Sequence, residues 1–209
     1  MAMKFPNARV IGTDLSPTQK ERPVSNVEWI AEDANDKDWG KKRYDYIHTR
    51  MMMGAFEDFR EIIQRSYDYL QPGGWMESQE AYPTVLCDDG TLDKETNAFY
   101  LYSKKLDEAA MTAGKPIRIA NKMKRWFQEV GFVDVHEEVF KIPINPWPKD
   151  PQFKLIGRFW ADSLMAGLQG FALALFTRYW GWSVEEVEVY LVNVRRAMQD
   201  RSVHAYHKL

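Results

Sequence analysis

The sequence contains a single cysteine, Cys87, among its 209 residues. One cysteine cannot form a disulfide within the chain, and it offers no thiol cluster for a zinc site. Charge of either sign is also not in excess, with 30 Asp and Glu against 28 Lys and Arg. No single-sign block indicates a nucleic-acid partner. These absences exclude a disulfide-stabilised secreted domain and predict an intracellular protein, cytoplasmic or nuclear.

A long hydrophobic run is missing as well. The main apolar stretch extends from Leu164 to Phe176 and is flanked by Asp162 and Arg178. A membrane-spanning helix requires roughly 20 apolar residues, so we expect a buried helix hairpin here and no membrane span. The N-terminal residues show neither the apolar core nor the small-residue cleavage site of a secretion signal.

The first half of the chain alternates short β-rich runs with a helical pattern. The runs ARVIGTD (8–14), VEWIAED (27–33), YDYIHTR (44–50) and GGWMESQEA (73–81) are typical of strands, and residues 56–70 have the apolar spacing of a helix. Parallel strands joined by crossover helices produce this alternation. The sequence therefore predicts an α/β fold.

The second half is richer in helical patterns. We predict helices over 92–113 and 119–130, a strand over 132–144, helical structure over 152–200, and the start of a last strand in VHAYHKL (203–209). The chain accordingly divides into three parts: a core of residues 1–83 and 117–150, a helical lid of residues 84–116, and a helical cap of residues 151–209 that ends in a partial last strand.

Several motifs occur in a specific order and spacing. They are VIGTDLSP (10–17), EDA (32–34), YDYIHTR (44–50), LQPGGWMESQE (70–80) and HAY (204–206). This set resembles the LaeA-like methyltransferases of fungi, which depend on S-adenosylmethionine (SAM) and are associated with secondary metabolism as regulators or tailoring enzymes. The resemblance covers nearly the whole chain and implies a Rossmann-like methyltransferase fold with seven strands.

The resemblance also implies cofactor-binding positions. Asp14 ends a strand, where a carboxylate can accept the hydrogens of both ribose hydroxyls of a nucleoside. Asp33 and Ala34 match the place where the family contacts adenine. The alternative for Asp14 is a turn or N-cap aspartate before Ser16, and Asp33 is otherwise an ordinary loop residue.

The sequence departs from the family at both ends. The family has a first strand and a glycine-rich cofactor loop before VIGTD, and this stretch is not in the sequence. In the family that strand lies in the middle of the sheet, so we expect a gap between the strands at 8–14 and 44–50. Direct pairing of these two strands, strand exchange in a homodimer, or a complementing chain would each close it. The last strand is expected to be partial because the sequence stops at Leu209.

Without the glycine loop, the sequence favours a SAM-independent enzyme that requires no cofactor. It would cyclise, rearrange or isomerise a hydrophobic metabolite held in an apolar pocket. Candidate catalytic residues are His48 and Arg50 at one strand end and Glu80 and Tyr82 after the next. His48 is alternatively a core histidine, and Arg50 a surface ion-pair residue.

Two other functions remain open. One is a SAM-dependent methyltransferase completed by a further segment or a partner chain, and the other is a non-catalytic regulatory or scaffolding relative. We predict no metal site, because His204 and His207 would lie on opposite faces of a strand.

Overall fold

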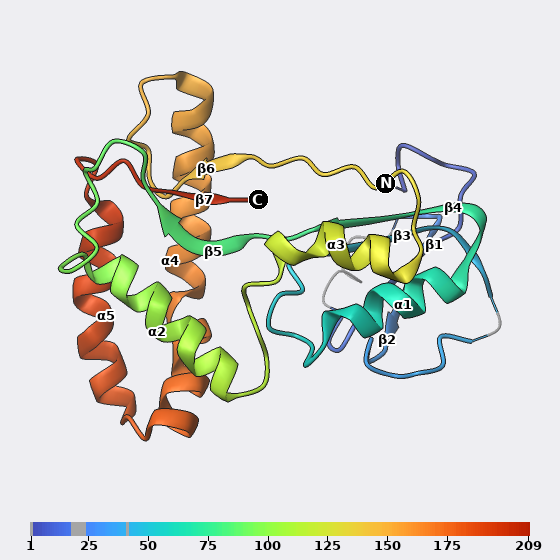
Figure 1. Cartoon of the computed structure of the whole chain (residues 1–209), viewed down its shortest axis with the longest axis horizontal. Coiled ribbons are helices and arrows are strands. Elements are labelled where there is room, and N and C mark those ends of the chain that lie inside the picture. The colour runs from blue at the N-terminus through green and yellow to red at the C-terminus, as the bar shows by residue number, and fades with distance from the viewer. Residues whose placement is uncertain (1, 18–23, 41) are drawn as a thin grey trace.

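The computed structural model describes residues 2–17, 24–40 and 42–209, and in this part the chain forms two halves (Figure 1). One half holds β1–β4 with helices α1 and α3, and the other holds α2, α4, α5 and β5–β7. The elements are β1 (Val10–Asp14), β2 (Val27–Ala31), β3 (Tyr44–Arg50), α1 (Phe59–Tyr69), β4 (Leu70–Gln79), β5 (Tyr82–Leu86), α2 (Ala98–Thr112), α3 (Ala120–Val130), β6 (Lys141–Pro143), α4 (Pro151–Trp180), α5 (Val184–Gln199) and β7 (Tyr206–Lys208).

The strands of the first half form two parallel pairs. Strand β1 pairs with β2 in a register that places Asp14 opposite Ala31, and β3 pairs with β4 so that Arg50 lies opposite Gln79. The α/β class and the positions of these four strands are confirmed. Among the described residues β1 and β3 belong to separate two-stranded sheets. Direct pairing, one of the three expected ways to close the gap, is therefore not what this structure shows.

Helices α1 and α3 cover one face of the β3–β4 pair. Asp58 caps α1 through a hydrogen bond from the Arg60 backbone N–H, and Gly131 ends α3 in the left-handed conformation at φ 114°. Their apolar stripes form one core. Its buried residues are Phe56, Phe59, Ile62, Ile63, Ile119, Met123, Trp126 and Phe127.

The second half has its own core, which α2, α4 and α5 share. Predicted lid residues on α2 and predicted cap residues on α4 and α5 therefore pack together, and the division at 84–116 and 151–209 remains a prediction. Ser183 and Glu186 form a reciprocal capping box at the start of α5. Gly181, at φ 69°, ends α4 and allows the chain to turn back into α5.

Helix α4 is continuous over 30 residues. The hairpin that we predicted within Leu164–Phe176 is wrong, because no turn residue interrupts the helix before Gly181. In the described part of the chain, α4 is the one helix whose length and composition would suffice to cross a membrane, and 17% of its most apolar window is buried. Leu168, Ala172 and Phe176 supply that buried side and pack into the core of the second half.

The second half also contains an antiparallel sheet in the order β5–β7–β6. The strand that we predicted over 132–144 pairs only at Lys141–Pro143, and Phe140 adds two reciprocal backbone hydrogen bonds with Leu209, of 2.8 and 2.9 Å. Residues 133–139 make no backbone hydrogen bond to another strand in the described ranges. The prediction is therefore wrong for this stretch, in which residues 133 and 134 form a bend and Asp134 has φ 51°, outside the extended region.

Candidate functional site

The carboxyl ends of β1 and β2 lie level with one another. The parallel register places Asp14 opposite Ala31, and the Glu32 backbone N–H donates to the Asp14 carbonyl oxygen at 3.1 Å. In open α/β sheets, ligands bind beyond such strand ends. The structure thus places the predicted cofactor residue Asp14 and the loop that carries Asp33 and Ala34 at one edge.

Both aspartates also make local turns. The Ser16 backbone N–H donates to Asp14 Oδ1 at 2.8 Å, and the Asn35 backbone N–H donates to Asp33 Oδ1 at 2.8 Å. Asn35 Nδ2 donates to the same oxygen, and these hydrogen bonds lower the pKa of Asp33. Asp14 is therefore a turn aspartate, the alternative that we weighed for it. In both aspartates the oxygen that accepts the local hydrogen bonds is Oδ1.

Ala34 anchors this loop to the first core. Its carbonyl oxygen accepts a hydrogen bond from the Arg65 guanidinium at 2.6 Å, and its side chain packs against the cluster of α1 and α3. The Arg65 guanidinium in turn lies 5.4 Å from the centre of the Trp39 ring. The loop after β2 is consequently held to α1 by a side chain that the sequence analysis did not single out.

The loop after β3 has an unusual backbone. Met51 has φ 54°, a left-handed conformation that is costly for a residue with a side chain, and its N–H donates to the Gln79 carbonyl oxygen at 2.9 Å. Gly54, at φ 78°, donates its N–H to the Pro116 carbonyl oxygen. Such conformations persist where the surroundings hold them, often at functional sites. The run of methionines before Gly54 was the only sequence signal of this loop.

Glu80 holds that loop in place. Its carboxylate is buried and accepts hydrogen bonds from the backbone N–H groups of Met52, at 3.0 and 2.9 Å, and Met53, at 3.0 Å. Burial raises the pKa of Glu80 and outweighs the opposing effect of these N–H donors. Glu80 therefore positions the loop after β3, which fixes the backbone beside the strand ends.

His48 and Arg50 lie on the opposite face of the same strand pair. Tyr46 precedes them on that face, and its ring lies 6.2 Å from that of His48. The Tyr46 hydroxyl hydrogen-bonds to Glu77, which also accepts from Gln79 Nε2 at 2.7 Å. The Tyr46 hydroxyl is the larger cause of the lowered pKa of Glu77. His48 is exposed, so the core-histidine alternative is wrong.

The four predicted catalytic residues therefore do not converge. His48 and Arg50 share an exposed face of the β3–β4 pair, whereas the Glu80 side chain is on the opposite, buried face and contacts the Met52 backbone. Tyr82 belongs to β5, where it pairs with Lys208. A general base needs to lie within hydrogen-bond reach of the proton that it removes. His48 and Arg50 thus belong to a polar, exposed strand face, and Glu80 is a buried carboxylate that positions a loop. The acid–base roles of the four residues stay a prediction.

A histidine–carboxylate pair does occur elsewhere, in a position that sequence spacing could not reveal. His204 Nδ1 lies 2.5 Å from Asp89 Oδ2, across 115 residues of sequence, and the His204 ring lies 4.7 Å from that of Trp147. Cys87 Sγ and Thr91 Oγ1 both donate to the other oxygen of Asp89. The carboxylate thus links the turn after β5 to the start of β7. In the described ranges no three His, Cys, Asp or Glu side chains are arranged to hold a metal.

Comparison with known proteins gives relatives along the whole chain. A family described as a methyltransferase domain matches residues 2–137. The methyltransferase pytC of Aspergillus terreus is 36% identical over 98% of this chain and 63% of its own length. The secondary metabolism regulator LAE1 of Cochliobolus heterostrophus is 34% identical over 100% of this chain and 69% of its own length.

Structural comparison gives the same fold at lower identity. A phosphoethanolamine N-methyltransferase of Haemonchus contortus, solved with phosphomonomethylethanolamine and S-adenosylhomocysteine, is 17% identical. The match covers 99% of this chain and 43% of that protein, with a TM-score of 0.50. The present chain thus spans about two thirds or less of the length of these relatives.

Proposed function

The chain belongs to the LaeA-like methyltransferase family, and we propose that the edge formed by β1 and β2 binds the adenosine part of SAM for methyl transfer in fungal secondary metabolism. One observation carries this proposal. Asp14 lies at the carboxyl end of β1, beside the loop of Asp33 and Ala34 that follows the parallel strand β2. Ligands of open α/β sheets bind beyond the carboxyl ends of the strands, and the similarity to methyltransferases supports SAM as the ligand.

The residues present fit a nucleoside at this edge. The hydrogen bond from the Ser16 N–H to Oδ1 orients the Asp14 carboxylate, which can then accept hydrogens from the two ribose hydroxyls. Asp33 has a lowered pKa and stays ionised at neutral pH, and Ala34 presents a small side chain beside the first core. SAM, when bound, supplies an electrophilic methyl group on a sulfonium.

Glu80 and the loop after β3 would complete the support for the cofactor. By accepting the N–H groups of Met52 and Met53, Glu80 fixes the backbone beside Arg50, at the carboxyl end of the β3–β4 pair. A fixed backbone lowers the entropy that binding must otherwise remove. This role needs no proton transfer by Glu80, which agrees with a carboxylate engaged by two backbone donors.

The arrangement of His48, Arg50, Glu80 and Tyr82 does not favour the cofactor-independent rearrangement that the sequence suggested. A second candidate is regulatory binding without catalysis, which is favoured by the similarity to proteins named as secondary metabolism regulators. A hydrophobic small-molecule substrate, a homodimer with strand exchange, and a complementing chain all remain proposals.

Binding of S-adenosylhomocysteine tests the main proposal. We expect it to raise the melting temperature of the chain, since a ligand at a hundred times its Kd stabilises by about 2.7 kcal/mol. Asp14→Asn should abolish the rise, because the amide keeps the acceptor for Ser16 but loses the charge and one acceptor oxygen. Asp162 is an exposed residue of α4, so Asp162→Asn is the matched control and should behave as wild type.

Absence of any rise with a folded wild-type chain would overturn cofactor binding. An equal rise in Asp14→Asn would overturn the assigned residue. Binding that is retained without methyl transfer to any small molecule tested would favour the regulatory candidate.

A further inference from the structure

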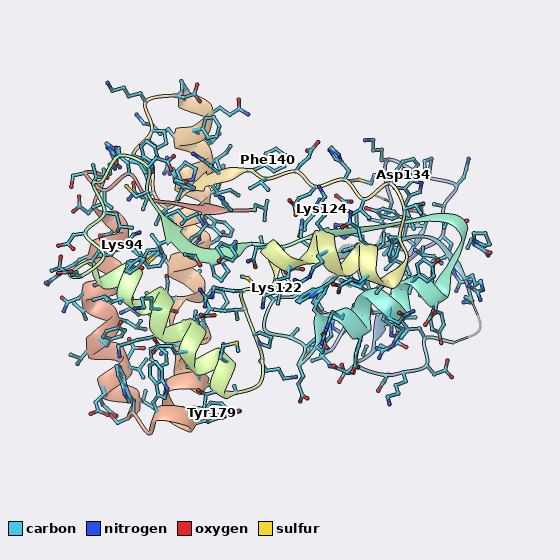
Figure 2. The ribbon with its side chains drawn as sticks, in the orientation of Figure 1. Lys94, Lys122, Lys124, Asp134, Phe140 and Tyr179 are labelled. Carbon is cyan, nitrogen blue, oxygen red and sulfur yellow. The ribbon has the colours of Figure 1, made fainter. Side chains whose placement is uncertain are left out.

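Aromatic rings gather at the turn between α4 and α5. Trp180 is the last residue of α4, Trp182 follows Gly181, and Tyr190 lies on α5. The ring centres of Trp180 and Trp182 lie 6.1 Å apart, and those of Trp182 and Tyr190 lie 5.4 Å apart with an angle of 88° between the planes. Figure 1 shows this end of α4, where the chain turns back into α5, and Figure 2 labels Tyr179 there. The perpendicular rings of Trp182 and Tyr190 form the corner of an aromatic box.

The rings of this turn already hold a cation of the same chain. Lys105 on α2 places its ammonium 5.1 Å from the centre of the Trp180 ring and 5.7 Å from that of Trp182. Among the residues that the structure describes, no carboxylate pairs with Lys105, and Asp107 on the same helix pairs with Arg118 at 2.7 Å. An ammonium is attracted by the negative faces of aromatic rings. The two tryptophans are therefore a cation-binding surface.

A hollow on the α5 side of Trp182 gives room for a second cation. Its volume is about 520 Å³, which is in the range of small-molecule sites, and it is lined by Trp182, Glu185, Glu186, Val189 and Tyr190. The hydroxyl oxygen of Tyr190 is buried and has no hydrogen-bond partner in the described part of the chain. Tyr190 thus contributes its ring to the lining, and not a polar group.

Two carboxylates supply negative charge to the hollow. Glu185 is exposed, and hydrogen bonds from its own backbone N–H and from Ser183 lower its pKa, so it is ionised at neutral pH. Glu186 accepts the Ser183 backbone N–H through Oε2 at 2.7 Å, which leaves Oε1 for a ligand. Two carboxylates outweigh the roughly half positive charge of the N-terminus of α5. Negative charge beside aromatic faces favours an organic cation as the ligand.

The lining favours a methylated ammonium over a primary one. A primary ammonium has three N–H donors that need acceptors when water leaves, whereas a quaternary ammonium has none. The rings of Trp182 and Tyr190 offer apolar contact to methyl groups, and so does Val189, which is 71% exposed. A cation that carries methyl groups would therefore fill the corner at a lower desolvation cost.

We propose that the hollow between Trp182 and Tyr190 binds a quaternary ammonium group, with Glu185 as its counter-charge. The group rests against the two perpendicular rings, and its methyl groups contact Val189. The site belongs to the half of the molecule that holds α2, α4 and α5, and it does not depend on cofactor binding at β1 and β2.

Titration with choline, followed through the NMR signal of its methyl groups, tests the proposal. We expect saturable line broadening. We expect the dimethylbutanol isostere of choline, in which a carbon replaces the nitrogen, to bind about tenfold more weakly. Ethanolamine, the unmethylated ammonium, should also bind more weakly than choline. Choline that does not bind, or that binds no better than either analogue, would overturn the proposal.

Variants of the lining locate the site. Glu185→Gln should weaken choline binding about threefold and leave the uncharged isostere unchanged, because it removes the charge and keeps the shape. Trp182→Leu should weaken choline binding at least about tenfold. Glu95→Gln and Trp75→Leu, at exposed positions elsewhere, are the matched controls and should bind as wild type. Glu185 is exposed, so its variant should fold, and wild-type affinity for choline in Glu185→Gln would overturn the assigned counter-charge.

Lys105 provides a readout with the opposite sign. Its ammonium and the bound group would share the Trp182 ring and repel one another. Lys105→Met keeps an apolar stem of similar length and should tighten choline binding about twofold or more. Weaker choline binding in Lys105→Met would overturn a site beside Lys105.

A peptide distinguishes the two sources of a quaternary ammonium group. If a pentapeptide with one trimethyllysine between glycines binds more tightly than choline, the group belongs to a protein side chain. If choline binds more tightly, the ligand is a small molecule. The same peptide with unmethylated lysine is the control, and equal binding of the two peptides would overturn recognition of the methyl groups.

Discussion

The buried carboxylate of Glu80 accepts the backbone N–H of Met52 through both of its oxygens, at 3.0 and 2.9 Å. The two residues are 28 positions apart, and the contact ties the end of the β3–β4 pair to the loop that leads into α1. The same carboxylate accepts the N–H of Met53. One side chain thus fixes two consecutive backbone N–H groups of the loop at the strand ends.

Replacement of Glu80 tests this tie. Glu80→Ala should lower the free energy of unfolding by about 1–3 kcal/mol, because it leaves two backbone donors without their acceptor. Glu80→Gln should cost less, since the amide oxygen can still accept one or both N–H groups. Urea denaturation measures both. Equal losses in the two variants would contradict the positioning role, and Glu77→Gln on the exposed face is the control.

The buried imidazole of His207 predicts a stability loss in mild acid. Burial lowers the pKa of His207 from 6.5 to about 4, and Trp160 Nε1–H donates to its Nδ1 at 3.2 Å. The unfolded chain therefore binds a proton between these pH values while the folded chain does not, so stability falls as the pH drops from 6.5 to 4. The loss from this group should reach about 3 kcal/mol.

Two variants isolate that contribution in urea denaturation at pH 7, 5.5 and 4. His207→Gln can still accept the Trp160 N–H but cannot gain a proton, so its stability should decline less over this range. His136→Gln, at an exposed position, should decline as the wild type does. Parallel curves for wild type and His207→Gln would rule out this explanation.

Two glycines of α4 should respond to alanine in opposite directions. A Cβ at Gly157 would collide with the backbone carbonyl of Asn145, whereas a Cβ at Gly170 would meet no atom within 4 Å. Gly157→Ala should destabilise the fold by about 1–3 kcal/mol through the forced backbone shift. Gly170→Ala should stabilise it by about 0.5–1 kcal/mol, because alanine loses less backbone entropy in a helix. Thermal unfolding of the two variants checks the sign of each change.

The Asp89–His204 pair predicts a second pH dependence, at lower pH. The hydrogen bond with His204, followed by those from Cys87 and Thr91, holds the pKa of Asp89 well below its usual 3.8. A lowered carboxyl pKa adds stability above about pH 3.8, and this stability is lost as the pH falls further.

The difference in urea midpoint between wild type and Asp89→Asn should therefore be largest near neutral pH and shrink below about pH 4. Asp162→Asn provides the comparison for loss of an exposed charge without these partners. A midpoint difference that stays constant from pH 7 to pH 2.5 would contradict the assignment.

Much of the secondary structure could be predicted from the sequence because its signals are local. The alternating runs at 10–14, 27–31 and 44–50 form strands as expected, and Gly131 ends α3 as its position suggested. The motifs around Asp14, Asp33 and Glu80 also identified the family. Helix periodicity, β-propensity and turn residues act within a few positions, so each can be recognised without its partners.

The sequence alone thus determined most of the helices and strands, the family that the chain resembles, and the residues that end the first strands. Only the tertiary structure decided what each strand pairs with and what each polar side chain contacts. Residues 133–139 have a strand-like sequence yet pair with no other strand in the described part of the chain, and Asp89 contacts His204 across 115 positions. Strand pairing and side-chain burial depend on segments that are far away in the sequence. A local sequence pattern carries no information about whether such a segment lies beside it.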